Sequence, residues 1–400
     1  MPLPLPLYLL ALAVFAQGTS EFMLSGLTPD IAHDLGISIP AAGSLTSAFA
    51  LGMIVGAPLS AVLARRWPRR SALFGFLAVF TAAHVVGAVT TSYGVLLTTR
   101  AVAALANAGF LTVALTTAAA LVAPDAKGRA TSILLGGTTL ACVAGVPGGA
   151  LLGQLLGWRA AFGAVGLICL PALAAVVRSV PADPQGPTGG APDDVPHTDL
   201  RTELRSLRSP RLLTLLLLGA LVNGATFCTF TYLAPLATGV AGIPEPWVPA
   251  LLALFGLGSF AGVTAAGRLS DARPMPVLVG GGAALLAGWV LLGYAAAGAT
   301  ATFALAFAQG ALSFAVGSTL IARALYAASG APLLAGACAT TALNVGAAVG
   351  PWTGGLASGG GFEAVPWVSA GLVAAAFAVA GGAMAARRTG PVNVTGPADS

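Results

Sequence analysis

The chain has 400 residues; 57% of them are hydrophobic, only 8% are charged, and the mean hydropathy is +0.90. Soluble domains carry about 25% charged residues, so these charges cannot cover a globule of this size, and most of its surface must face lipid. The net charge of +5 is not gathered into a basic domain, so no nucleic-acid partner is expected.

Apolar runs recur along the whole chain. The N-terminal stretch "MPLPLPLYLL" lacks the basic residues of a signal peptide, and no cleavage site follows, so we interpret the first run as a spanning helix. Runs of about 18–27 residues are long enough to cross a bilayer, and they lack the short alternation of a strand barrel. The sequence therefore predicts an all-α membrane protein with 12 transmembrane helices, at residues 7–27, 42–64, 71–90, 94–122, 130–156, 160–177, 212–236, 247–267, 276–297, 301–326, 333–357 and 364–386.

The basic residues give this arrangement an orientation. With 12 spans both termini lie on one side, and 16 of the 18 Lys and Arg fall on that side. Arg159 falls in a loop on the other side, and Arg100 lies within a span. Because cytoplasmic loops carry the excess of basic residues, the sequence predicts a multi-pass protein of the cell membrane with both termini in the cytoplasm.

One long hydrophilic segment divides the chain. Residues 178–211, which include "PADPQGPTGGAPDDVPHTD", have the composition of a cytoplasmic linker. The predicted domains are two six-helix bundles at 1–177 and 212–388, followed by a cytoplasmic tail at 389–400. The four cysteines lie in separate apolar runs without metal or redox spacing, so no metal and no cofactor is expected.

The two halves resemble each other. An offset of 206 residues aligns Gly52 with Gly258 and Gly56 with Gly262, together with four further Gly, Pro and Phe positions. A charged turn follows the second span of each half ("ARRWPRR", "RLSDARP"), and a Gly/Pro cluster interrupts the fifth span of each half ("GVPGG", "GPWTGG"). Paired repeats with a site between them are typical of alternating-access transporters.

With these features the chain resembles the major facilitator superfamily over almost its whole length. The turn "GRLSDARP" is similar to the family's signature loop, with the motif residues Gly267, Arg268, Asp271 and Arg273. The first-half copy, "ARRWPRR", contributes Arg66, Arg69 and Arg70, but Arg65 stands where the family usually has an acid. The resemblance implies that this acid helps to close the cytoplasmic side, so the first-half latch is in doubt.

Two further motifs resemble the drug:proton antiporter branch. "LTTRAVAALANAGF", with Arg100, is similar to the helix 4 motif of that branch. "GTTLACVAGVPGGALLG" is similar to its helix 5 motif, with Gly145, Pro147, Gly148 and Gly149. The resemblance implies a kinked helix contact that prevents leak; an ordinary proline kink is the alternative.

The match narrows further in four segments. "GTSEFMLSGLTPDIAHDLGIS", "SAFALGMIVGAPL", "ANAGFLTVALTTAAALV" and "LLGWRAAF" together resemble the actinomycete chloramphenicol-resistance exporters. This resemblance implies proton-coupled efflux of a small neutral antibiotic by a monomer, with the proton as coupling ion. A looser similarity to bacterial sugar and nucleoside exporters of the same branch keeps such cargo as the alternative.

Glu21 is the one acid that falls inside a predicted span. A charge there costs roughly 2.5–3.5 kcal/mol on insertion scales, so such residues usually face a cavity and have a function. Glu21 and Arg100 each lie six residues from the outer ends of their spans, which places both roughly 9 Å below the outer boundary. We hypothesise that Glu21 binds and releases a proton while Arg100 pairs with its charged form. The alternative is a static salt bridge that fixes the two helices.

The remaining cavity residues are inferred from the helices that line the cavity in the resembled fold. The candidates are apolar or hydrogen-bonding side chains, as a neutral amphipathic cargo requires: Phe49, Met53, Asn107, Asn223, Phe227, Tyr232 and Asn344. Each polar residue among them could equally join two helices. We interpret His84 and Gln309 as packing residues, and His84 would lie on a peripheral helix.

Two other classes of protein fit the sequence less well. An enzyme would need a catalytic set, but no metal cluster, Ser–His–Asp arrangement or H-E-x-x-H motif is evident. An ATP-driven pump would need a phosphate-binding loop, whereas the single lysine lies in "DAKGRA". A channel would not require a paired repeat with a single proton site. No catalytic residue is therefore expected.

Overall fold

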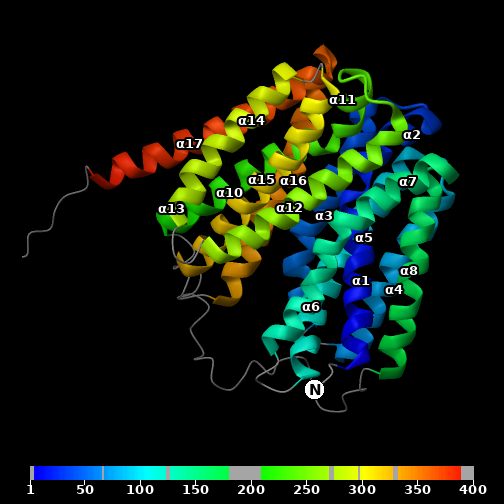
Figure 1. The fold of residues 1–400 in the computed structure, drawn as a ribbon. Helices are drawn as coiled ribbons and strands as arrows, with labels where there is room; N and C mark the ends of the chain where they lie inside the picture. Colours follow the sequence, from blue (N-terminus) through cyan, green and yellow to red (C-terminus); the bar gives the residue numbers. More distant parts are fainter. Residues whose placement is uncertain are drawn as a thin grey trace, which may run out of the picture.

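The computed structural model describes residues 4–64, 67–122, 127–179, 209–269, 274–295, 298–327 and 332–388. Every regular element in these ranges is a helix, which confirms the all-α prediction (Figure 1). A chain immersed in lipid must satisfy its backbone groups within each segment, and helices do so. In the N-terminal half the helices are α1 (Leu5–Phe22), α2 (Leu24–Leu35), α3 (Ile39–Ala64), α4 (Arg69–Val89), α5 (Tyr93–Ala120), α6 (Lys127–Leu140), α7 (Val146–Leu156) and α8 (Trp158–Ser179).

The C-terminal half has the corresponding set of helices. They are α10 (Pro210–Thr231), α11 (Leu233–Gly239), α12 (Val248–Leu269), α13 (Pro274–Pro276), α14 (Gly282–Ala295), α15 (Ala299–Ala327), α16 (Pro332–Ala357) and α17 (Val365–Arg388). Two five-residue π-helical turns, Ala141–Gly145 and Val277–Gly281, join α6 to α7 and α13 to α14. Short 3-10 turns lie at Glu245–Trp247, Ser358–Gly360 and Phe362–Ala364.

Eleven helical segments in the described residues are long and apolar enough to cross a membrane. They correspond to all the predicted spans except 333–357. That span corresponds to α16, which is a helix of 26 residues and therefore also exceeds the roughly 20 residues that a bilayer requires.

Four predicted spans are not single regular helices, and one of them, the ninth, contains the π-helical turn Val277–Gly281. The first is divided at Met23: the Met23 backbone N–H still bonds to the Thr19 carbonyl, and the chain then continues as α2 as far as Leu35. The seventh is divided in the same way at Tyr232, before the short helix α11. Pro235 lies just after the second break and lacks the N–H that would bond to the Thr231 carbonyl, whereas Pro29 is an interior residue of α2. The fifth span contains the π-helical turn just before Pro147.

The 206-residue offset also relates contacts in space. Gly52 of α3 faces the Ala101 carbonyl of α5 so closely that a Cβ atom at this glycine would overlap with it. Gly258 of α12 faces the Phe307 carbonyl of α15 in the same manner. Gly56 and Gly262 repeat the pattern one turn further along. The second and fourth spans of each half, α3 with α5 and α12 with α15, therefore cross at matched glycines, which permit close backbone approach.

The two halves meet near one end of the bundle. There α2 packs against α10 and α11, α3 against α16, and α7 against α12, and we call this end the closed side. Three hydrogen bonds between the halves are present in the described ranges: Ser47 Oγ donates to the Ala348 carbonyl at 2.7 Å, Gln154 Nε2 to the Glu245 carbonyl at 2.6 Å, and Thr28 Oγ1 to the Thr231 carbonyl at 3.5 Å.

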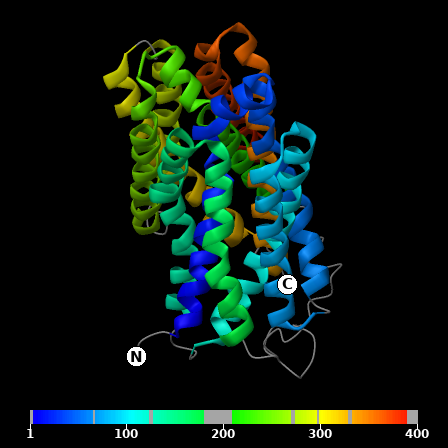
Figure 2. The same ribbon diagram turned by 90° about the vertical axis from the view of Figure 1, so that its right-hand side faces the viewer.

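Away from the closed side the halves diverge. Figure 1 shows α6 and the start of α1 at one end of the bundle, with α10, α13 and the end of α17 inclined away from them. Figure 2 shows the view turned by 90°, with α2 at the end opposite the start of the chain. We call the end at which α1 begins the terminal side.

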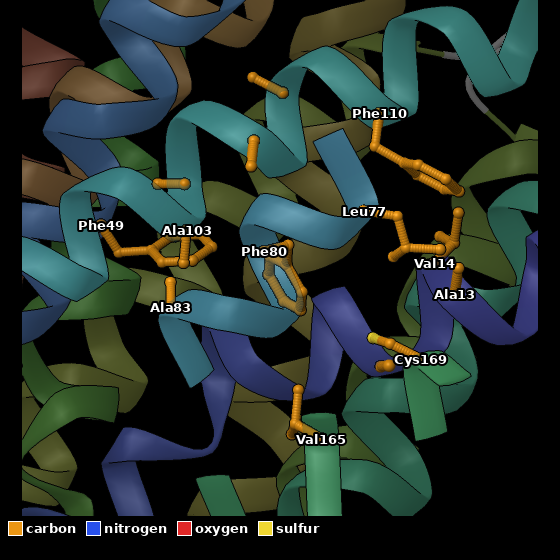
Figure 3. Close-up of a cluster of buried hydrophobic side chains, with 14 of the residues drawn as sticks. Ala13, Val14, Phe49, Leu77, Phe80, Ala83, Ala103, Phe110, Val165 and Cys169 are labelled. Carbon is orange, nitrogen blue, oxygen red and sulfur yellow. The ribbon is translucent and has the colours of Figure 1, made fainter. Parts of the chain in front are cut away.

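The N-terminal half has a continuous core. Side chains of α1, α4, α5 and α8 form it, including Val14, Leu77, Phe110 and Cys169. Figure 3 shows these residues together with Phe80, which lies between the helices. Through this core α1 packs against α8 and α5, and α4 packs against the same two helices.

Candidate functional site

Arg100 is buried inside the N-terminal half, with 1% of its surface exposed. It extends from α5 to α1, where Nη1 donates a hydrogen bond to Ser20 Oγ at 2.7 Å and Nη2 donates to the Ser20 carbonyl at 2.8 Å. The guanidinium carbon lies 4.4 Å from the ring centre of Phe49, a cation–π distance. The arginine is therefore bound to the residue that precedes Glu21.

Glu21 is partly exposed rather than fully buried. Its carboxylate interacts electrostatically with Arg100, and Cys142 of the π-helical turn lies within its electrostatic range. No hydrogen bond or ion pair joins this carboxylate to another residue within the described ranges. The Glu21–Arg100 salt bridge considered from the sequence is thus not formed in this conformation, and the arginine is bound to Ser20 instead.

His84 was expected to be a packing residue, and the structure gives it a polar role. Its Nε2 lies 2.7 Å from Ser20 Oγ, and its Nδ1 lies 2.8 Å from the Phe80 carbonyl. The residue is buried, with 1% exposure, and its helix α4 packs against α5 and α8. A histidine within a lipid-spanning helix was the available sequence signal, but its assignment to a peripheral helix obscured it.

The motif in the fifth span, which corresponds to the π-helical turn and α7, forms a close seam with the end of α1 and the start of α2. Gly145 faces Thr19, Gly149 faces Met23, and Gly153 faces Leu27, each one helical turn further along. A Cβ atom at Gly145 would overlap with the Thr19 side chain, whereas at Gly148 it would meet nothing within 4 Å. Three of these small residues therefore set how closely α1 approaches the π-helical turn and α7, and Gly148 does not.

Aromatic side chains from both halves meet next to Glu21. They surround a small cavity lined by Phe22, Cys142, Val146, Thr226, Phe227, Phe230, Phe255 and Phe314. Phe22 and Phe227 stack across the two halves with ring centres 5.7 Å apart, and Phe230 stacks on Phe255 at 4.5 Å. The free space is about 10 Å³, roughly the size of one water probe, so a larger ligand requires these rings to separate. We call this set the aromatic cluster.

Of the cavity residues expected from the sequence, Phe227 belongs to the aromatic cluster. The three asparagine side chains donate hydrogen bonds to nearby groups: Asn107 Nδ2 to Met53 Sδ at 3.6 Å, Asn223 Nδ2 to the Leu343 carbonyl at 2.7 Å, and Asn344 Nδ2 to the Thr340 carbonyl at 3.0 Å. The Tyr232 hydroxyl donates to the Pro351 carbonyl at 2.9 Å. In this conformation these side chains join two helices or, for Asn344, bond to the backbone within their own helix.

The loop motif lies at the terminal side. Arg69 and Arg70 begin α4, and Gly267 and Arg268 fall in the last turn of α12. The remaining motif residues, Arg66, Asp271 and Arg273, lie outside the described residues, as does Arg65.

Acidic residues lie on the closed side. Asp34 accepts hydrogen bonds from Arg159 and from Trp158 Nε1, and these bonds hold the pKa of Asp34 below its usual value. Desolvation and the neighbouring Glu245 carboxylate of the other half raise the pKa of Asp30, which His33 partly offsets. Asp30 and Glu245 thus oppose each other across the contact between the halves.

The proximity of these two carboxylates predicts that the contact between the halves on the closed side depends on pH. Because contact with the other half raises the pKa of Asp30, the closed side is favoured as pH falls through that pKa and weakened above it. Replacing Asp30 with Asn should therefore strengthen closure at neutral pH. Hydrogen exchange of α2 and α11 should slow about two- to five-fold, since exposed charge pairs contribute at most about 1 kcal/mol. An Asp34→Asn variant, which lies away from Glu245, should show no such slowing, and equal rates in Asp30→Asn and the native protein would contradict the assignment.

The sequence pattern of the Major Facilitator Superfamily matches residues 10–336. The chain belongs to the major facilitator superfamily. It is therefore a membrane transporter of this family, as the sequence predicted. Two solved structures of a bacterial homologue of the human lysosomal transporter Spinster, in unoccupied and occupied inward-facing conformations, share its fold, with TM-scores of 0.74 and 0.76. Each covers 96% of both chains, at 19% and 18% identity.

Relatives of similar length are found in two bacteria. The chain is 60% identical over 382 residues to the chloramphenicol resistance protein of Streptomyces lividans, covering 94% of this chain and 96% of that protein. It is 33% identical over 372 residues to the inner membrane transport protein YdhP of Escherichia coli strain K12, covering 92% and 93% of the two chains.

Proposed function

We propose that this transporter exports a small neutral antibiotic, with chloramphenicol as the first candidate, in exchange for protons. The 60% identity to a chloramphenicol resistance protein supports the cargo. One observation supports the coupling above all: Glu21 is a carboxylate within a spanning helix that has no direct partner among the described side chains and adjoins the aromatic cluster. An acid in this position can change its protonation without breaking an ion pair.

The distribution of basic residues supports the direction of transport. The predicted spans put sixteen of the 18 Lys and Arg on the side of the N-terminus. Of these, Arg69, Arg70 and Arg268 lie at the terminal side, which is therefore assigned to the cytoplasm. The closed side then faces outward, and this conformation would receive its cargo from the cytoplasm. Both termini lie in the cytoplasm, and the protein acts as a monomer in the cell membrane, without a nucleic-acid partner, an enzymatic reaction or a cofactor other than the transported proton.

The aromatic cluster supports a drug rather than a sugar as cargo. Its lining is largely aromatic and aliphatic, with Thr226 and Cys142 as its polar members. Such surfaces bind an aromatic ring by stacking, whereas a sugar or nucleoside would require many hydrogen-bonding groups. Chloramphenicol is neutral and carries one aromatic ring beside its amide and hydroxyl groups, so it fits this chemistry. Export of a sugar or nucleoside remains the alternative from the resemblance alone.

The coupling follows from the position of Glu21. In the conformation seen here Glu21 adjoins the aromatic cluster between the halves, and cargo that enters from the cytoplasm displaces its proton. After the halves reopen outward, a proton from outside neutralises Glu21 and the cargo leaves. The change back to the inward-facing conformation costs less with a neutral Glu21 than with the carboxylate, because a charge in an apolar environment is unfavourable. This return step therefore carries the proton inward.

Growth tests identify the cargo. A strain that lacks its own exporters should grow at several-fold higher chloramphenicol concentrations when it expresses this protein, and a panel of unrelated drugs, sugars and nucleosides shows how selective the effect is. Adding a protonophore while ATP is still present should abolish the efflux. Efflux that persists in the presence of the protonophore would contradict proton coupling. Absence of chloramphenicol resistance at normal expression would contradict the assigned cargo.

The aromatic cluster gives a residue-level prediction. Replacing Phe255 with Leu should weaken chloramphenicol binding about three- to tenfold, because the loss of an aromatic contact costs about 0.5–1.5 kcal/mol beyond area burial. Phe260 on the same helix provides a matched control, since 52% of its surface is exposed. Binding of radiolabelled drug to the purified variants measures this loss of affinity. Equal affinities of Phe255→Leu and Phe260→Leu would exclude the aromatic cluster as the binding site of the drug.

A further inference from the structure

A buried hydrogen-bonded chain connects three helices of the N-terminal half. It runs from Arg100 on α5 to the Ser20 hydroxyl on α1 at 2.7 Å, and from that hydroxyl to His84 Nε2 on α4 at 2.7 Å. It ends at the Phe80 carbonyl, 2.8 Å from His84 Nδ1. The two rings beside His84 belong to Phe80 and Phe162, with centroid distances of 4.2 and 5.8 Å.

The chemistry of the end groups fixes the direction of each hydrogen bond. The Phe80 carbonyl only accepts, so His84 Nδ1 donates to it and Nε2 of the neutral ring is an acceptor. Arg100 only donates, so the Ser20 hydroxyl accepts from it and donates its own proton to His84 Nε2. A charged imidazolium would bring a second cation to the same hydroxyl and leave the serine proton without an acceptor. His84 is therefore neutral, with its proton on Nδ1.

This arrangement directs the lone pairs of Ser20 toward the guanidinium. Each Nη group of Arg100 then donates one hydrogen bond to Ser20, one to its hydroxyl and one to its carbonyl, whereas the buried Nε has no partner in the described residues. Glu21, the next residue on α1, has no ion pair with Arg100 within the described ranges. The position of the arginine on Ser20 thus leaves the carboxylate free to exchange a proton.

We propose that His84 is the positioning residue for Arg100: acting through Ser20, it holds the guanidinium away from Glu21 in this conformation. The proposal rests on proton exchange at Glu21, which belongs to the proposed function, and adds a residue from a helix that does not line the cavity. Among the charged groups near this chain, Arg100 interacts electrostatically with His84, and Glu21 interacts electrostatically with Arg100. Cys142 is the titratable group beside Glu21, and α8 contributes Phe162 and Gly166 next to the ring.

Two amide replacements separate the two hydrogen bonds of the ring. His84→Gln can place its carbonyl oxygen where Nε2 accepts from Ser20, but it gives up the bond to Phe80. His84→Asn can keep a donor to the Phe80 carbonyl, but it is too short to accept from Ser20. Loss of the acceptor should release Arg100 to pair with Glu21. The carboxylate form is then stabilised, and Glu21 takes up its proton only at lower pH.

The readout is the infrared carboxyl band of purified protein without drug, titrated with pH and assigned to Glu21 by its absence in Glu21→Gln. We expect the midpoint of this band to move by about one pH unit toward acid in His84→Asn and in Ser20→Ala, and to stay unchanged in His84→Gln. The double variant Ser20→Ala/His84→Asn should move no further than Ser20→Ala alone, because both changes act on the same hydroxyl. If His84→Asn does not fold, His84→Leu, which also lacks the acceptor for Ser20, provides the same comparison with His84→Gln.

Two outcomes overturn the proposal at different levels. Equal midpoints in native protein, Ser20→Ala and His84→Asn, or shifts that add in the double variant, would refute the role of His84 and leave proton exchange at Glu21 intact. A native protein without a titrating Glu21 band would refute proton coupling itself, and the role of His84 with it.

Discussion

Replacing Glu21 with Gln should abolish uphill export and leave the fold intact. One proton moving across about 100 mV contributes about 2.3 kcal/mol, and one pH unit adds about 1.4 kcal/mol. For a neutral cargo these terms support a concentration ratio of several hundred-fold. Glutamine has the shape of the protonated acid but cannot release a proton, so the ratio should fall to about one. Accumulation of labelled chloramphenicol in proteoliposomes under an imposed pH gradient measures it.

Controls distinguish coupling from misfolding. Glu21→Gln should still bind the drug and still exchange it between equal concentrations, since the aromatic cluster is unchanged. Glu363→Gln is a matched control, because Glu363 lies in the short turn before α17, outside the regular spanning helices. Native resistance in cells that express Glu21→Gln at the normal level would refute the role assigned to this acid.

The second large effect is expected at Gly145. Any side chain there overlaps with Thr19, one residue before Ser20, and rotation of Thr19 gives no relief because its Cβ would lie only 2.9 Å away. Overpacking of this kind costs about 1–3 kcal/mol, and the strain would displace α1 at the point where Arg100 binds it. We expect Gly145→Ala to lower the thermal midpoint of the purified protein by several degrees and to reduce resistance strongly.

Gly148 supplies the control for this prediction. It belongs to the same motif, but an added Cβ meets nothing within 4 Å, so Gly148→Ala should retain both stability and export. Adding Thr19→Ala to Gly145→Ala should recover part of the loss. Equal thermal stability and equal export in Gly145→Ala and Gly148→Ala would refute the role assigned to the seam between α1 and the helix 5 motif.

Much of the fold follows from composition and spacing. Apolar runs of bilayer length must become helices, and the 206-residue offset points to the matched crossings at Gly52 and Gly258. The breaks at Met23 and Tyr232 were missed because hydropathy does not change there. The second break lies beside Pro235, which lacks the N–H that would bond to the Thr231 carbonyl, whereas Pro29 lies inside α2, beyond the first break. Hydropathy averaged over a window of residues does not detect a local loss of backbone hydrogen bonds.

The site was predicted in outline but not in its contacts. Depth along two helices placed Glu21 and Arg100 near each other, yet it could not show which group the guanidinium binds. That depends on side-chain directions across α1, α4 and α5, which bring Ser20 between Arg100 and His84. Similarly, Phe230, Phe255 and Phe314 could not be distinguished by sequence from exposed phenylalanines of the spans such as Phe74, Phe260 and Phe307.

Proton release triggered by the drug tests the central claim most directly. Chloramphenicol added to purified, weakly buffered protein near neutral pH should release up to about one proton per chain, with none released from Glu21→Gln although the drug still binds. Equal release from both proteins would assign the proton to another group, and drug binding to the native protein without any release would contradict exchange of drug for protons at Glu21.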